Sequence, residues 1–187
     1  MRIVAGKFRG KQLNSPSDDS IRPTADRVRE SMFNILGSRL GPVFEGLKVL
    51  DLFAGTGALG FEALSRGAAH VTFVDTGAES RGLVRDHIQA FGVAGITKLL
   101  RRDATALGAP GTFGQFDLVF LDPPYGLGLG EKAMAELAAN GWLKPGATLV
   151  WEESADVAVT VPERFALDDE RTYGAAAVRF LTFGTAD

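Results

Sequence analysis

From residue 47 to residue 152 the chain alternates between short apolar stretches and longer stretches with helical spacing. The apolar stretches are expected to be strands, and two more follow before the C-terminus. The seven expected strands are Leu47–Phe53, His70–Asp75, Thr97–Arg101, Phe116–Asp122, Ala147–Glu152, Phe165–Arg171 and Ala177–Phe183. The expected helices are Gly57–Arg66, Glu79–Phe91 and Glu131–Trp142, the last stopped by Pro145-Gly146. Repeated strand–helix units with short loops predict an α/β fold, with a doubly wound, mostly parallel sheet that ends in an antiparallel pair.

The first 40 residues differ from the rest of the chain in charge. They hold eight Lys and Arg against four Asp and Glu, or +4, whereas the remainder holds twelve against nineteen, or −7, which sums to the net −3. Arg2–Ala5 and Lys11–Leu13 flank a glycine-rich turn, which predicts a small hairpin. A Ser- and Pro-rich loop, Asn14–Ser20, then precedes a helix capped by Thr24. We expect one domain over residues 1–187, in which residues 1–40 form a basic extension that binds a polyanion, although a solvated terminus explains the charge equally well.

Composition excludes several classes of protein. Cysteine is absent, which excludes a disulfide scaffold, a thiolate metal site and a cysteine nucleophile, and fits a reducing compartment. The opening residues do not predict a signal peptide, and no apolar run approaches the roughly 20 residues that a membrane span needs. We therefore expect a cytoplasmic protein without membrane contact. His70 and His87 have no ligand-like neighbours in the sequence, so no metal site is expected.

The glycine-rich segment DLFAGTGALG, residues 51–60, continues directly from the first expected strand. It contains GxGxxG, and Asp75 follows Gly55 by twenty residues, so a nicotinamide-dependent dehydrogenase is one interpretation. Asp51 favours a second interpretation, because its carboxylate would repel a pyrophosphate. The same carboxylate could pair with the ammonium of S-adenosylmethionine, which has no phosphate. Asp75 would then accept the ribose hydroxyls, and Asp103 the adenine amine. The expected cofactor-binding residues are Asp51, Phe53, Ala54, Gly55, Thr56, Gly57, Leu59, Gly60, Asp75, Asp103 and Ala104.

A second candidate site is Asp122-Pro123-Pro124-Tyr125, which closes the fourth expected strand. The two prolines fix the backbone and remove amide donors, which leaves carbonyl groups as acceptors. A carboxylate and a fixed carbonyl can accept both hydrogens of an exocyclic NH2 group and so aim the nitrogen lone pair at a methyl donor. The Tyr125 ring offers a face on which a base can stack. We expect all four residues to belong to the catalytic site.

These motifs resemble those of a known family. Rossmann-like methyltransferases carry a DxFxGxG loop, here DLFAGTG, and those that act on exocyclic amines carry (N/D/S)PP(Y/F/W), here DPPY. More narrowly, the chain resembles the 16S ribosomal RNA guanine-N2 methyltransferases of the RsmD type. The likeness includes RIVAGKFRGKQL at the start, RPTADRVRE at residues 22–30, Phe33-Asn34, GALGFEALSRGA at residues 57–68, and Trp142-Leu143. Asp75 stands where many members of the class have Glu, which serves the same ribose contact.

The resemblance implies a seven-stranded Rossmann-like sheet and the methylation, with S-adenosylmethionine, of one guanine in 16S rRNA. The partner would be this RNA within an assembling small subunit, and the protein would act as a monomer. The expected RNA-binding residues are Lys7, Arg9, Lys11, Arg22, Arg27 and Arg29. Lys7, Arg9 and Lys11 alternate along a possible strand and would share one face of it.

Three other functions are compatible with parts of this pattern. DPPY chemistry also serves DNA adenine-N6 and cytosine-N4 methyltransferases, but 187 residues leave little room for a target-recognition region. Protein glutamine methyltransferases use a similar motif, usually with Asn in first position, and would not explain the basic N-terminus. A ribosome-assembly factor that keeps the fold without turnover would not need an intact DPPY.

Overall fold

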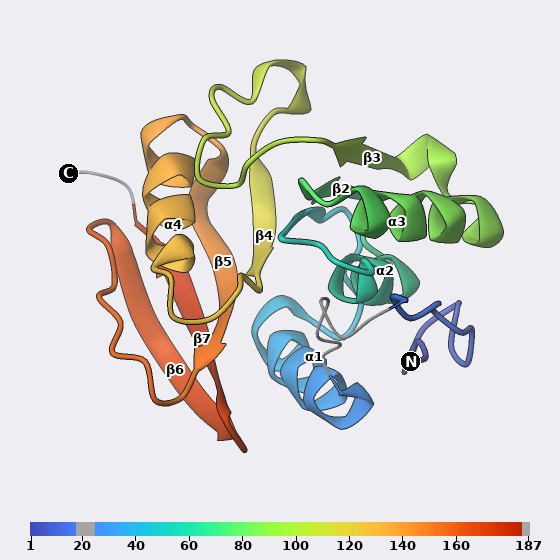
Figure 1. Ribbon diagram of the computed structural model, residues 1–187, viewed down its shortest axis with the longest axis horizontal. Helices are drawn as coiled ribbons and strands as arrows, with labels where there is room; N and C mark the ends of the chain where they lie inside the picture. Colours follow the sequence, from blue (N-terminus) through green and yellow to red (C-terminus); the bar gives the residue numbers. More distant parts are fainter. Residues whose placement is uncertain (18–24, 185–187) are drawn as a thin grey trace. The chain divides into compact units, whose positions relative to one another are not determined.

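The structure, a computed structural model, describes residues 1–17 and 25–184 (Figure 1). By its internal contacts the chain divides into two compact units, Met1–Arg101 and Arg102–Asp187. Within the described residues all seven predicted strands are present, β1 to β3 in the first unit and β4 to β7 in the second. No helix in these described ranges is long and apolar enough to cross a membrane.

The first unit combines a parallel sheet with helices. Its strands are β1 (Lys48–Leu52), β2 (His70–Val74) and β3 (Thr97–Leu100), in the order β3-β2-β1. Its helices are α1 (Asp26–Leu40), α2 (Ala58–Ser65) and α3 (Ala78–Phe91), with the short 3-10 helix η1 (Ala94–Ile96). Val49 of β1 lies opposite Val71 of β2. After their first residue β1 and β2 are completely buried, as expected for parallel strands covered on both faces.

Two glycines allow α2 to lie close to β2. A Cβ atom on Gly60 would lie 2.4 Å from a ring carbon of Phe73 and 2.9 Å from a methyl of Val71. Gly57, with φ of +81°, would place a Cβ 2.6 Å from the ring of Phe61. The packing of α2 therefore requires glycine at both positions, and this packing fixes where the helix begins.

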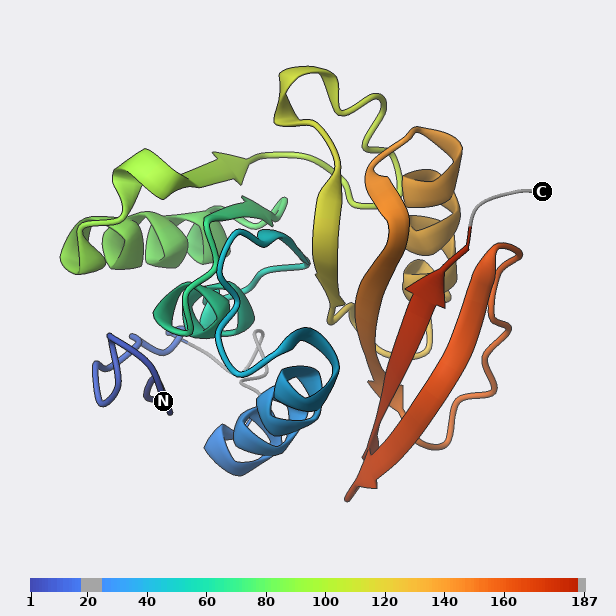
Figure 2. The same cartoon turned by 180° about the vertical axis from the view of Figure 1, so that it is seen from behind.

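The second unit combines a mixed sheet with one long helix among its described residues. Its strands are β4 (Phe116–Leu121), β5 (Leu143–Ser154), β6 (Phe165–Tyr173) and β7 (Ala176–Phe183), in the order β4-β5-β7-β6. Its helices are α4 (Leu129–Ala139) and the 3-10 helix η2 (Gly111–Phe113). β4 and β5 are parallel, whereas β7 is antiparallel to both of its neighbours. α4 lies in front of β5 in Figure 1 and behind it in Figure 2, so it covers one face of this strand.

The boundary between α4 and β5 differs from the prediction. The sequence predicts a helix that Pro145-Gly146 stops, but both residues lie inside β5, where the pairing with β4 is irregular. A bulge of this kind tolerates a residue without an amide donor. The helix ends earlier, because the Asn140 side chain donates to the carbonyl of Glu136 (3.0 Å) and Gly141 adopts φ of +78°.

The N-terminal residues form a turn rather than the predicted pair of strands. We call residues 1–13 the N-terminal turn. A single antiparallel bridge joins Arg2 and Gln12, and the N–H of Ile3 donates to the carbonyl of Lys11 (3.0 Å). Residues 5–10 between them are bends and turns. The two halves thus approach each other as predicted, but without a regular ladder.

The N-terminal turn packs against α2. The Glu62 carboxylate accepts the backbone N–H groups of Val4 (3.0 Å) and Ala5 (3.1 Å). The Ser65 hydroxyl accepts the N–H of Phe8 (2.9 Å). The side chains of Ile3 and Leu13 are buried. The N-terminal turn is therefore part of the core of the first unit.

Helix α1 begins at Asp26, and Ala25 occupies the capping position without a side-chain hydrogen bond. Thr24, the predicted cap, lies outside the described residues, as do residues 18–20 of the predicted loop. The buried face of the helix consists of Arg29, Met32, Phe33 and Leu36. The apolar side chains of Val28 and Ile35 in the same helix are only partly buried.

Candidate cofactor and acceptor sites

Asp51 lies at the end of β1, where the glycine-rich loop begins, and is 1% exposed. Its Oδ2 accepts the N–H of Gly60 (3.0 Å) in the first turn of α2, where the helix dipole favours negative charge. Burial raises the pKa of Asp51 well above its ordinary value; the bond from Gly60 lowers it, and the charge of Asp75 raises it. A cationic partner would stabilise the charged form of a carboxylate in this environment.

Asp75 follows β2 directly and holds the loop from the other side. Its Oδ2 accepts the N–H of Gly55 (2.9 Å), and its Oδ1 accepts the N–H of Gly77 (2.7 Å). The side chain is half-buried, and each carboxylate oxygen can accept a further hydrogen bond. Asp51 and Asp75 thus flank the loop at the carboxyl ends of neighbouring parallel strands, the edge at which such sheets bind ligands.

The loop itself contains an accessible and a buried part. Phe53 has φ of +55°, a left-handed conformation that is unfavourable for a residue with a side chain and is often found at binding sites. Ala54 donates its N–H to the carbonyl of Val74 (3.1 Å). The partly exposed residues are Phe53, Ala54 and Gly55, and the buried ones are Thr56, Gly57, Leu59 and Gly60. The first group can meet a ligand, whereas the second fixes the start of α2.

Asp103 and Ala104 lie in the second unit. Asp103 is exposed, and its Oδ1 accepts the N–H (2.8 Å) and the hydroxyl (2.7 Å) of Thr105. These two bonds lower the pKa of Asp103. The lowered pKa favours the charged carboxylate, and its contact with the adenine amine stays a prediction. Ala104 is buried.

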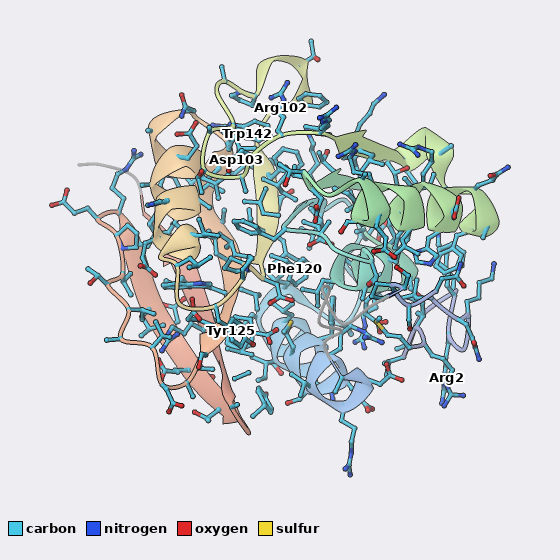
Figure 3. The ribbon with its side chains drawn as sticks, viewed as in Figure 1. Arg2, Arg102, Asp103, Phe120, Tyr125 and Trp142 are labelled. Atoms are coloured by element: carbon cyan, nitrogen blue, oxygen red, sulfur yellow. The ribbon has the colours of Figure 1, made fainter. Side chains whose placement is uncertain are left out.

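The DPPY segment, Asp122–Tyr125, follows β4 directly. Asp122 and Tyr125 are partly buried, and Pro123 is buried. Figure 3 shows Tyr125 beyond the end of the strand that carries Phe120. β4 and β5 run in parallel with the last residue of β4 opposite Trp151, so the two residues after Trp151 lie beside the DPPY segment.

These two residues, Glu152 and Glu153, are almost completely buried. The Tyr125 hydroxyl donates to Glu152 Oε1 (2.5 Å), and the N–H of Gly126 donates to Glu153 Oε1 (3.1 Å). Burial and the charge of Glu153 raise the pKa of Glu131 in the first turn of α4. Two buried carboxylates of β5 therefore hold the end of the DPPY segment and fix the position of the aromatic ring.

The basic residues predicted to bind RNA differ in exposure. Lys7, Arg9 and Lys11 of the N-terminal turn and Arg27 of α1 are exposed, and Arg22 lies outside the described residues. The prediction that the first three alternate along a strand is wrong, because residues 5–10 form a turn. The ammonium groups of Lys7 and Lys11 both contact the Phe8 ring, 4.9 and 5.1 Å from its centre.

The position of Arg29 contradicts the prediction that this residue binds RNA. It is completely buried, and its guanidinium donates to the carbonyl of Arg2 and to Asp26 (2.9 Å), while its Nε lies 4.0 Å from Glu62. This charge joins α1, the N-terminal turn and α2 and is not presented to RNA. Arg2, which the sequence does not single out, is exposed on the same turn (Figure 3).

Three functional candidates are not among the residues predicted from the sequence. They are Glu152, Glu153 and the buried His87. Glu152 and Glu153 close an apolar strand, the same signal that identifies Asp51, so this signal could have found them. In residues 1–17 and 25–184 no group of His, Asp and Glu is arranged to hold a metal ion.

Comparisons with known proteins show which family the chain belongs to. The model of the family described as conserved hypothetical protein 95 matches residues 1–182. The chain is 36% identical over 181 residues to a Haemophilus influenzae protein named ribosomal RNA small subunit methyltransferase D, covering 96% of this chain and 92% of the relative. It is 38% identical over 130 residues to the tRNA (guanine(6)-N2)-methyltransferase of Thermus thermophilus, covering 67% of this chain and 38% of the relative.

The fold is also that of a solved structure. The Escherichia coli protein described as "putative methyltransferase yhhF" is 33% identical, with a TM-score of 0.83 and 98% of both chains covered. The predicted seven-stranded, Rossmann-like sheet with antiparallel C-terminal strands is therefore confirmed.

Proposed function

Because the chain belongs to the family described as conserved hypothetical protein 95, we propose that it is an S-adenosylmethionine-dependent methyltransferase of small-subunit ribosomal RNA. The observation that carries this proposal is the similarity to the Haemophilus influenzae relative, whose name states that substrate, over nearly the full length of both proteins. The methyl acceptor is the exocyclic N2 amine of a guanine. The name of the Thermus thermophilus relative, which specifies guanine N2, supports this choice of atom.

The residues of the first unit suit S-adenosylmethionine. The buried Asp51 carboxylate, with its raised pKa, would receive the ammonium of the amino-acid end. Asp75 would accept the ribose hydroxyls with its remaining lone pairs, and the exposed backbone of the glycine-rich loop would line the ligand. Asp103, which belongs to the second unit, remains the predicted acceptor of the adenine amine. When bound, this cofactor supplies an electrophilic methyl group on a sulfonium.

The DPPY segment suits an exocyclic amine. The Asp122 carboxylate and a carbonyl of the proline pair would accept the two hydrogens of the guanine NH2 group, so that its lone pair is free for the methyl carbon. This arrangement lowers the barrier mainly by orientation. The Tyr125 ring, fixed through its hydroxyl by Glu152, would stack on the guanine after it leaves its neighbours.

The exposed cations of the N-terminal turn would bind the RNA backbone. The first 40 residues carry +4 against −7 for the rest, so phosphates are attracted to this part of the chain and repelled by the remainder. The partner is 16S rRNA within an assembling small subunit, which the protein modifies in the cytoplasm as a monomer.

Transfer of tritiated methyl from S-adenosylmethionine to small ribosomal subunits and to purified small-subunit rRNA, both from cells without this protein, followed by nucleoside analysis, tests the proposal. The expected product is N2-methylguanosine at a single position, and rRNA from cells without this protein should lack the modification at that position. Methyl transfer to DNA or to a glutamine side chain instead of rRNA would contradict the substrate. Binding of NAD without binding of S-adenosylmethionine would contradict the reaction class.

A further inference from the structure

His87 lies in the middle of α3, and both of its ring nitrogens have a partner. The side chain is 2% exposed and packs against the rings of Phe61 and Phe91. Its Nδ1 lies 3.0 Å from the carbonyl oxygen of Thr56 in the glycine-rich loop. Its Nε2 lies 2.8 Å from the backbone nitrogen of Asn14. One imidazole thus joins the loop proposed to bind the cofactor to the segment that follows the N-terminal turn.

The partners determine which nitrogen carries the proton. The backbone N–H of Asn14 can only donate, so Nε2 accepts, and Nδ1 carries the proton that it donates to the Thr56 carbonyl. Burial lowers the pKa of His87, while the bond to Thr56 and the charge of Asp86 raise it. The net direction is downward, which favours the neutral ring that this pattern requires. A positively charged ring would present a donor to the Asn14 donor and break the link.

Residues 14–17, which we call the strap, are attached to α3 at two points. Asn14 is held by His87, and the N–H of Ser17 donates to Glu79 Oε1 (2.7 Å) in the first turn of the helix. The strap therefore runs from the middle of α3 towards its beginning. The residue just before the helix, Gly77, donates its N–H to Asp75 at the proposed ribose site.

The N-terminal turn is attached to the same helix. The Phe8 ring lies 5.1 Å from the Phe91 ring, and the Lys11 ammonium lies 5.1 Å from the Phe91 centroid. Phe91 in turn packs against His87. Contacts thus continue without a gap from the exposed cations of the turn, through Phe91 and His87, to the Thr56 carbonyl.

We propose that His87 is a positioning residue that couples RNA binding at the N-terminal turn to cofactor binding at the glycine-rich loop. RNA phosphates on Lys7 and Lys11 steady the turn and the strap, and the two hydrogen bonds of His87 pass this constraint to Thr56. The loop is then held in its binding conformation, so each ligand strengthens the binding of the other, as linkage requires. This inference rests on the proposed function.

The test measures the affinity of S-adenosylhomocysteine with and without transcribed 16S rRNA. The wild-type dissociation constant should fall when RNA is present, by about 5- to 150-fold if the coupling has the usual size. Asn14→Pro removes the N–H that His87 accepts, whereas Asn14→Ala keeps it and is the matched control. The quantity compared is the ratio of the dissociation constant without RNA to that with RNA. This ratio should approach one in Asn14→Pro and in His87→Phe, which keeps an aromatic ring. It should stay at the wild-type value in Asn14→Ala.

His87→Asn provides a second variant if the others fold poorly, since its amide can still donate to Thr56 but cannot reach Asn14. A folded Asn14→Pro or His87→Asn protein with the wild-type ratio overturns the proposal. A wild-type ratio of one, with both ligands bound, also overturns it. If the wild-type protein methylates no rRNA, the proposed function fails instead, and the two failures are therefore distinguishable.

Discussion

At the scale of single residues, the buried Asp51 links the stability of the protein to its ligand. Its pKa is raised chiefly by burial, so the folded protein holds this proton more tightly than the unfolded chain. The stability that the protonated form contributes is present at low pH and is lost as the pH rises through the raised pKa. A bound ammonium group would offset this loss, which gives the carboxylate a functional reason to be buried.

We therefore predict opposite effects of Asp51→Asn on stability and binding. The amide oxygen can still accept the N–H of Gly60, so thermal melting without ligand at pH 7 should occur at the wild-type temperature or above it. Cofactor affinity should weaken by about 1.5–3 kcal/mol, the range for a hydrogen bond to a charged group. Affinity should also rise with pH through the Asp51 pKa in the wild type and lose this dependence in the variant.

Calorimetry with S-adenosylmethionine at several pH values measures this effect. Asp86→Asn, which removes the same charge from an exposed site on α3, is the matched control and should bind normally. Unchanged affinity in a folded Asp51→Asn protein would rule out the ammonium contact.

Asp122 should act on the reaction rather than on cofactor binding. Asp122→Asn keeps the shape but replaces one acceptor oxygen by a donor, so the amine can no longer be oriented. Turnover should fall by about 10²- to 10⁴-fold, the range for a positioned catalytic group, with affinity for S-adenosylhomocysteine unchanged. Single-turnover transfer and calorimetry on the same preparation separate the two quantities, and a parallel loss of both would place Asp122 in the cofactor site instead.

Tyr125 offers a matched pair of variants. Tyr125→Ala removes the stacking face and should lower kcat/KM for RNA. The loss of transition-state stabilisation should be roughly 1–3 kcal/mol, the value of one base–aromatic contact. Tyr125→Phe keeps the ring and loses only the bond to Glu152, so its effect should be much smaller. Equal losses in the two variants would show that the hydroxyl with its bond to Glu152, rather than the stacking face, accounts for the effect.

At the scale of elements, the strands were easier to predict than the boundaries between helices and strands. The predicted strand His70–Asp75 and the observed β2 differ by one residue, because an apolar run between polar residues defines a buried strand on its own. The stop at Pro145-Gly146 is wrong for the opposite reason: whether a proline ends an element depends on the partner strand, and here a bulge against β4 accommodates it.

The same distinction applies to the candidate sites. Asp51, Asp75 and Asp122 belong to local motifs and can be identified from the sequence alone. The contacts of Glu152 with Tyr125, of Arg29 with Glu62 and of His87 with Asn14 join residues that are far apart in the chain. Only the pairing of β4 with β5, the packing of α1 on α2 and the attachment of the strap to α3 bring these side chains together.

The N-terminal turn gives a prediction at this scale. Deleting residues 1–13 would remove the buried side chains of Ile3 and Leu13, each worth about 1.5–3 kcal/mol. It would also leave the Glu62 carboxylate without two of its hydrogen-bond donors. The melting temperature should therefore fall by about 6 °C or more, given roughly 2–4 °C per kcal/mol in a protein of this size. Differential scanning calorimetry measures the shift. A truncated protein that melts at the wild-type temperature would mean that the turn is a free extension after all.

At the scale of the whole molecule, the uneven charge predicts where polyanions are held. The part of the chain after residue 40 carries −7 and repels RNA on average. The exposed cations of the N-terminal turn then decide whether RNA stays bound. Arg29 is excluded from this group by its burial, and Arg2 joins it.

The last prediction follows from this distribution. Charge reversal in Lys7→Glu/Arg9→Glu should weaken RNA binding and flatten its dependence on salt, because fewer counterions are released. If each side chain contacts one phosphate, the slope of log K against log salt should shrink in magnitude by about 1.4–1.8. Lys98→Glu/Lys132→Glu changes the net charge by the same amount at exposed sites elsewhere and should keep the wild-type slope. Filter binding between low and moderate salt measures both, with melting curves to show that each protein is folded. Equal slopes in the two double variants would mean that RNA responds to total charge and not to the N-terminal turn.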